Sequence, residues 1–188
     1  KTEEPHYDDF QVKDTSDSDN NVILSKVNNK TYTASLSAIG DVLIHDRVYN
    51  PAYIGNGKYN FVPHLKQVKP YLEKADITVA NQESMIGGTK IGLSSYPSFN
   101  SPHEVGDALK HSGVDIVTLA NNHTLDRGED AIQSAITYWN KIGLDYTGSY
   151  VSAEDQRRIR IIEKNGIIFS FLAYTYGTNG ISVPQDKP

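Results

Sequence analysis

The chain of 188 residues contains no cysteine. Neither a disulfide framework nor a thiolate metal site can therefore form. A metal site in this chain would need oxygen and nitrogen ligands instead. The absence says little about the compartment, because cysteine-free chains occur both inside and outside cells.

The sequence also lacks a long hydrophobic run and an excess of basic residues. No apolar run approaches the length of a membrane span, and no signal peptide opens the chain, so we expect any anchor or signal to lie before Lys1. The net charge of −5 resides in residues 1–20, which hold seven acidic side chains and two lysines. The remaining residues are close to neutral and show no basic face, which excludes nucleic acid as a partner.

Composition divides the chain into two parts. Residues 1–28 are acidic and polar and lack apolar periodicity, which is typical of a flexible leader or linker. Whether the short apolar patch Val22-Ile-Leu24 adds a strand or packs on the domain stays open. We expect residues 29–188 to form a single domain.

The remaining pattern predicts an α/β fold. We expect strands over residues 31–39, 75–80, 116–119 and 144–147, and helices over 61–74, 102–113 and 128–142. Strands alternating with helical crossovers indicate a mostly parallel sheet. The dipeptide Asn165-Gly166, between the apolar runs 158–163 and 167–173, predicts a C-terminal antiparallel hairpin. Residues 49–60 and 85–101 are expected to be loops.

Single residues refine this pattern. Pro70 is expected to kink or interrupt its helix, and Ser101 to cap a helix that starts at Pro102. Trp139 is predicted to pack in the core, and Gly143 to end the third helix.

Polar residues follow three of the predicted strands. The central one is the buried run Asp115-Ile-Val-Thr-Leu119, which leads into Asn121, Asn122 and His123. The first strand ends at Gly40-Asp41 with His45 close behind, and the second is followed by Asn81 and Glu83. Because the carboxyl ends of parallel strands meet at one sheet edge, these side chains are expected to converge there. The alternative is that they only cap the following helices and turns.

The chemistry of this group leaves two possibilities. Mixed oxygen and nitrogen ligands without sulfur suit Mn²⁺, Fe²⁺ or Zn²⁺ better than Ca²⁺. A site of this kind is found in two-metal hydrolases that act on phosphate esters. The competing interpretation is a polar pocket for a small ligand or polymer that contains no metal.

Five motifs resemble the CapA-type bacterial capsule synthesis family, in the family's order over residues 33–180. They are Ala38-Ile-Gly-Asp-Val-Leu-Ile-His45, Ala80-Asn-Gln-Glu-Ser84, Phe99-Asn-Ser-Pro102, Val114-Asp-Ile-Val-Thr-Leu-Ala-Asn-Asn-His-Thr-Leu-Asp126 and Leu172-Ala-Tyr-Thr-Tyr-Gly-Thr-Asn-Gly180. The resemblance implies a fold related to calcineurin-like metallophosphatases, of which this chain would be the N-terminal half of an αββα sandwich. It also implies a component of poly-γ-glutamate capsule synthesis, anchored outside the cell membrane, with the acidic leader as spacer after the anchor.

The resemblance assigns roles to particular residues. The implied metal ligands are Asp41, His45, Glu83, Asn122 and His123. His45 and His123 are also the candidate catalytic residues. Residues expected to support the ligands or bind substrate are Asn81, Asn121, Asp126, Thr178 and Asn179. The family continues with a His-Trp-Gly motif, and no histidine follows His123, so the resemblance implies an incomplete metal site in this chain.

Two classes of function remain open. The protein is either a metal-dependent hydrolase or transferase acting on a phosphoester or amide bond, or a non-catalytic module that binds poly-γ-glutamate or its membrane synthase complex. A half-sandwich would expose one sheet face, so a dimer is also expected.

Overall fold

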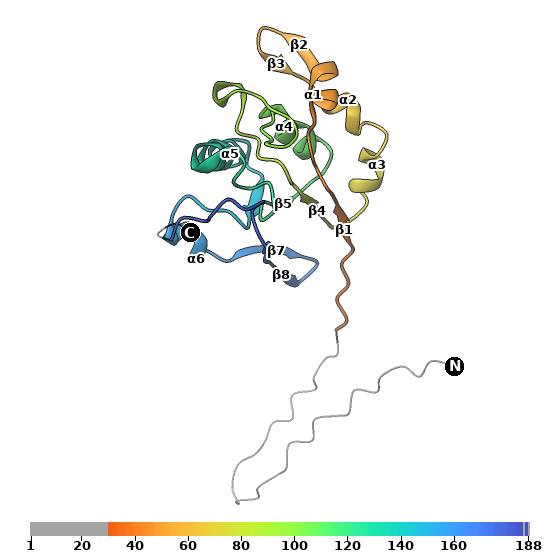
Figure 1. The fold of residues 1–188 in the computed structure, drawn as a ribbon. Helices are drawn as coiled ribbons and strands as arrows, with labels where there is room; N and C mark the ends of the chain where they lie inside the picture. Colours follow the sequence, from red (N-terminus) through yellow and green to blue (C-terminus); the bar gives the residue numbers. More distant parts are fainter. Residues whose placement is uncertain (1–29, 186, 188) are drawn as a thin grey trace, which may run out of the picture. The chain divides into compact units, whose positions relative to one another are not determined.

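A four-stranded parallel sheet organises the part of the chain that the computed structural model describes, residues 30–185 and Lys187 (Figure 1). Its order is β1 (Leu36–Ile39), β4 (Ile77–Asn81), β5 (Ile116–Thr118) and β6 (Asp145–Thr147). The predicted parallel α/β sheet is thus confirmed. The leader, 1–28, with its Val22–Leu24 patch, lies outside the described residues. None of the helices in the described part has the length and apolarity of a membrane span.

Two amphipathic helices, α4 (Glu104–His111) and α5 (Gly128–Ile142), contribute apolar residues to the same buried core as the sheet. Trp139 on α5 is fully buried in the same apolar cluster as Leu109 of α4 and Val117 of β5, as its spacing predicts. Gly143 ends α5 in the left-handed conformation, with φ of 64°, which a glycine adopts without steric cost.

The region after the first strand departs from the prediction of a loop over 49–60. It contains α1 (Asp46–Ala52) and a small hairpin of β2 (Tyr53–Gly55) and β3 (Lys58–Tyr59). The turn between these strands is Asn56-Gly57, with φ values of 52° and 69°. Asn56-Gly57 is the same type of hairpin turn as Asn165-Gly166, but its flanking strands of three and two residues are too short to show an apolar alternation in the sequence.

Other helix and strand boundaries also differ. β1 begins at Leu36, later than predicted, because Ser35 is engaged by the Asp76 carboxylate, through its backbone N–H at 2.7 Å and its hydroxyl at 2.8 Å. The predicted helix over 61–74 is interrupted into α2 (Val62–Leu65) and α3 (Lys69–Leu72), with Pro70 in the first turn of α3. The prediction that Ser101 caps a helix starting at Pro102 is wrong. Its hydroxyl lies 3.0 Å from Ser84 Oγ, and α4 starts at Glu104.

The C-terminal hairpin is confirmed as β7 (Arg160–Lys164) and β8 (Ile167–Phe171), turning at Asn165-Gly166. It is preceded by the unpredicted short helix α6 (Ala153–Arg157), where Ser152 Oγ accepts the Asp155 N–H. The hairpin and the residues that flank it expose several apolar side chains, namely Ile159, Ile161, Ile168 and Leu172. Exposed apolar side chains of this kind could form the interface of the expected dimer. The dimer itself stays a prediction.

Candidate metal centre at the sheet edge

The sheet brings the three predicted strand ends together. β1 pairs with β4 so that Ile39 lies beside Ala80, and β4 pairs with β5 so that Asn81 lies beside Thr118. The segments that follow these strands carry Asp41, Glu83 and the loop 121–123. They therefore leave the sheet side by side at one edge.

Asn81 is the centre of the hydrogen-bond network at this edge. Its Nδ2 donates to Asp41 Oδ1 at 2.5 Å, and its Oδ1 accepts from Thr118 Oγ1 and Asn121 Nδ2, both at 2.9 Å. Gly40 permits this approach, because a Cβ at position 40 would stand 2.6 Å from the Asn81 Cβ. Asn81 thus ties the ends of all three strands together.

The loop after β5 has a conformation set by Thr124. Its hydroxyl donates to the Leu119 carbonyl at 2.6 Å, while its oxygen accepts the Asn121 N–H at 2.8 Å. α5 starts only at Gly128, after Arg127, with no side-chain cap. The alternative that Asn121 or Asn122 caps the following helix is therefore wrong for α5.

His123 is held by Asp126, a residue that the sequence suggested as a support. Nδ1 of His123 lies 2.7 Å from Asp126 Oδ2, and the same oxygen accepts the Phe99 N–H at 2.7 Å. The Asp126 side chain is 3% exposed. Nε2 of His123 faces Glu83 Oε1 at 3.9 Å. A carboxylate on one ring nitrogen fixes the ring and leaves the other nitrogen for a ligand.

Glu83 and Asp41 form a pair of like charges beside this imidazole. Burial raises the pKa of Glu83, and the neighbouring Asp41 carboxylate raises it further, whereas His123 acts to lower it. A cation bound between these two carboxylates would stabilise the charged form of both.

Replacing Glu83 with glutamine is expected to stabilise the metal-free chain at neutral pH. Because folding raises the pKa of Glu83, the wild-type chain loses stability as the pH rises through that value, and a neutral glutamine does not. Thermal unfolding at about pH 7.5 should show the variant a few degrees higher, and at about pH 4 the two should coincide. Glu163→Gln, at an exposed position on β7, is the matched control. A Glu83→Gln chain less stable than wild type at neutral pH would contradict this electrostatic account.

His45 is turned toward α1 and the loop 85–101. Its Nδ1 lies 2.6 Å from Asp46 Oδ1 and 2.5 Å from Ser95 Oγ. The hydrogen bond from His45 holds the pKa of Asp46 below its usual range. Because both partners meet the same ring nitrogen, this trio is no relay of the Ser-His-Asp kind, which uses both nitrogens of the imidazole.

Phe99 connects the two histidines. Its ring packs edge-to-face against His45 at 5.5 Å and against His123 at 4.8 Å between centroids. The sequence reasoning missed Asp46, Ser95 and Phe99 as parts of this site. Asp46 had a local signal, since it directly follows His45 at the start of a helix, and Phe99 opens one of the motifs that carry the family resemblance.

The remaining candidates lie further out. Asn179 Nδ2 is 3.2 Å from His123 Nδ1, and its Oδ1 accepts from Asn122 Nδ2 at 3.2 Å. Thr178 instead bonds the Ile181 carbonyl and lines a neighbouring cavity. The structure therefore gathers Asp41, Glu83 and His123, whereas Asn122 is at the exposed rim and Nδ1 of His45 is engaged by Asp46 and Ser95.

The donors fit a divalent metal in kind. They comprise two adjacent carboxylates and an imidazole oriented by a third carboxylate, which are ligands of Mn²⁺, Fe²⁺ and Zn²⁺. Within residues 30–185 and Lys187, no group of three or more His, Asp or Glu side chains has the arrangement of a metal site.

Comparison with known proteins agrees with this architecture. Residues 35–188 match the family described as bacterial capsule synthesis protein PGA_cap. The chain belongs to this bacterial capsule synthesis family. It is similar to the capsule biosynthesis protein CapA of Bacillus anthracis, with 24% identity over 151 residues that cover 75% of this chain and 34% of CapA.

Two uncharacterized proteins of Sinorhizobium fredii, y4sH and y4uA, are each 26% identical over 135 residues, covering 69% of this chain and 27% of each relative. The chain thus spans between about a quarter and a third of the length of the curated relatives that it matches.

Proposed function

We propose that this protein is a membrane-anchored, extracytoplasmic component of poly-γ-glutamate capsule synthesis or export, acting at the outer face of the bacterial cell membrane. Membership of the capsule synthesis family and the similarity to CapA support the biological role. Its partners would be the polymer or the membrane synthase complex that makes it.

We further propose that the sheet edge holds a divalent metal, Mn²⁺, Fe²⁺ or Zn²⁺. The observation that carries this proposal is the meeting of Asp41 and Glu83 beside His123 Nε2. Those three residues would bind the ion, with Asn122 adding an amide oxygen and His45 able to serve as a further ligand or as a general acid or base. When bound, such a metal supplies a Lewis acid that polarises a phosphoryl or carbonyl oxygen.

The second candidate function is an active metal-dependent hydrolase or transferase for a phosphoester or amide bond. It is favoured by the pairing of each histidine with a carboxylate, His45 with Asp46 and His123 with Asp126. Such pairing fixes which imidazole nitrogen carries the proton, as general acid–base chemistry requires.

Capsule output in cells that carry single substitutions tests the role of the site. Asp41→Ala and His123→Ala should reduce polymer output to background without lowering the amount of folded protein. Asp145→Ala, exposed at the start of β6, should leave output unchanged. Wild-type output from both site variants would contradict a role for this sheet edge, and would leave a module that works through polymer or partner binding alone.

A further inference from the structure

A second feature adjoins the metal centre without being part of it. A cavity of about 570 Å³ lies beyond the carboxyl ends of β5 and β6, where Ala120 and Gly148 follow the strands. Ala120 directly precedes Asn121, and Thr178, also in the lining, directly precedes Asn179. A ligand in this cavity would therefore extend to the loop that carries His123.

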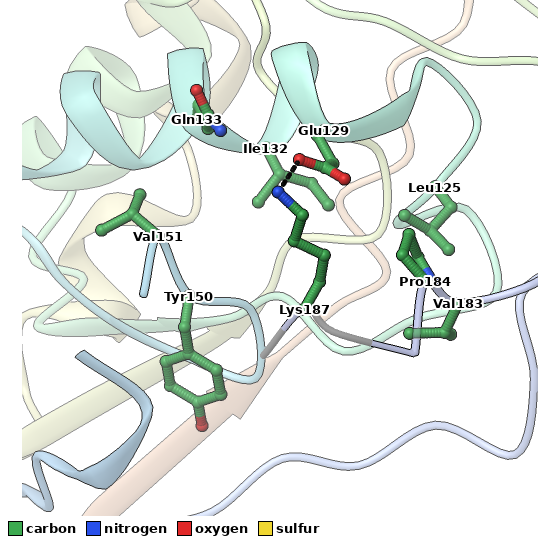
Figure 2. Close-up of a pocket in the computed structure, with 9 residues that line it drawn as sticks. All are labelled: Leu125, Glu129, Ile132, Gln133, Tyr150, Val151, Val183, Pro184 and Lys187. Atoms are coloured by element: carbon green, nitrogen blue, oxygen red, sulfur yellow. Dashed lines mark ion pairs between the residues drawn. The ribbon is translucent and has the colours of Figure 1, made fainter. Parts of the chain in front are cut away.

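The walls of the cavity are largely apolar. Leu125, Ile132, Leu172 and Val183 contribute aliphatic surface, and Tyr150 and Tyr174 contribute aromatic surface. A smaller pocket of about 70 Å³ shares four lining residues with it, Leu125, Ile132, Tyr150 and Val183. Figure 2 shows this smaller pocket, where Lys187 forms an ion pair with Glu129 at 3.1 Å. The two hollows are therefore adjacent, and residues of the C-terminal segment and of α5 line both.

Arg157 is the one charged residue among the described residues that line the larger cavity, which has no carboxylate in its wall. Arg157 is exposed at the end of α6. Among residues 30–185 and Lys187 its guanidinium has no carboxylate partner, in contrast to Arg160, which pairs with Asp155. A guanidinium without a carboxylate partner, in a wall whose other side chains are uncharged, is suited to bind a carboxylate that arrives with the ligand.

We propose that this cavity binds a stretch of an extended, carboxylate-bearing chain, with Arg157 pairing with a carboxylate and the apolar walls contacting the methylene groups. The volume exceeds what a single small anion fills, and Arg157 is the only cation in the described lining. The size and charge of the cavity therefore favour a chain over free phosphate. The proposal rests on the proposed function for the identity of the polymer, a γ-linked glutamate chain, whose repeat carries one carboxylate and two methylene groups.

Equilibrium binding of a fluorescent γ-linked glutamate oligomer to the purified chain tests the proposal. Arg157→Gln should weaken binding about tenfold, the effect of losing one charge-assisted hydrogen bond. Arg157→Lys should recover part of the loss, because it restores the charge without the planar fork. Arg158→Gln is the matched control, since the neighbouring arginine is also exposed and lies outside the cavity lining. Equal affinity of Arg157→Gln and wild type, or no binding by wild type, would overturn the proposal.

Two further measurements distinguish polymer binding from binding of a simple anion and from the proposed metal site. Inorganic phosphate that displaces the oligomer at equal concentration would identify a simple anion site and overturn the assignment to a polymer. The metal content of Arg157→Gln should equal that of wild type. If the wild-type protein retains metal but does not bind the oligomer, only the polymer-binding proposal is contradicted. If it binds the oligomer through Arg157 but retains no metal, the polymer-binding proposal is supported and the proposed metal site is contradicted.

Discussion

Replacing Arg160 with methionine is expected to lower the free energy of unfolding by about 3 kcal/mol. Arg160 is 5% exposed, and its Nη2 lies 2.5 Å from Asp155 Oδ1. Its other nitrogens donate to backbone carbonyls, among them that of Tyr146 at 3.0 Å, and the guanidinium lies over the rings of Tyr146 and Tyr150. Methionine keeps much of the aliphatic volume but leaves the Asp155 carboxylate, itself 12% exposed, without its counter-charge.

The control for this prediction is Arg158→Met, two residues earlier in the chain. Arg158 is exposed, so its replacement should change stability by no more than about 0.5 kcal/mol. Urea unfolding of the three proteins measures the difference. Similar midpoints for Arg160→Met and Arg158→Met would show that the buried ion pair contributes no more than an exposed side chain. Because Arg160 joins β7 to β6 and to α6, it also supports the wall of the cavity that contains Arg157.

Replacing Asp126 with alanine is expected to destabilise the chain by about 2 kcal/mol and to weaken metal binding roughly 10–100-fold. The stability is lost because the Phe99 N–H, bonded to Asp126 Oδ2 at 2.7 Å, loses its acceptor. The metal affinity falls because His123 Nδ1 loses the carboxylate that orients the ring.

Asp126→Asn separates these two effects. The amide oxygen can still accept from Phe99, so most of the stability should return, while a neutral partner orients and polarises the imidazole less strongly and metal affinity should stay low. Thermal unfolding and a titration with Zn²⁺ or Mn²⁺ measure the two quantities. Wild-type metal affinity in Asp126→Ala would contradict the orienting role of this carboxylate.

Much of the fold followed from local signals that agree with the tertiary packing. The apolar spacing of residues 128–142, ended by Gly143, predicted α5 with its observed limits, because the same face that repeats along the sequence meets the sheet. The Asn165-Gly166 turn was recognised because left-handed backbone at both positions is a strong requirement. In contrast, β1 starts late because Asp76, distant in sequence, engages Ser35, and no local pattern encodes that contact.

The candidate site likewise contains residues that the sequence predicted and residues that it did not. The strand-end rule anticipated that Asp41, Glu83 and His123 come together, since it depends only on strand order and direction. The contacts that Ser95 and Phe99 make with the histidines come from the long loop 85–101, whose path is fixed by the buried Asn100 side chain through bonds to Gly87, Gly88 and Gly92. Sequence spacing carries no information about where such a loop folds back.

Metal content tests the central claim most directly. The protein expressed from its complete reading frame, loaded with Mn²⁺ or Zn²⁺ and freed of excess ion, should retain metal when measured by plasma mass spectrometry. His123→Ala should lose that metal, whereas His64→Ala, at an exposed position on α2, should keep it. Absence of metal from the wild-type protein after loading, or equal metal in wild type and His123→Ala, would contradict a metal centre at the edge formed by β1, β4 and β5.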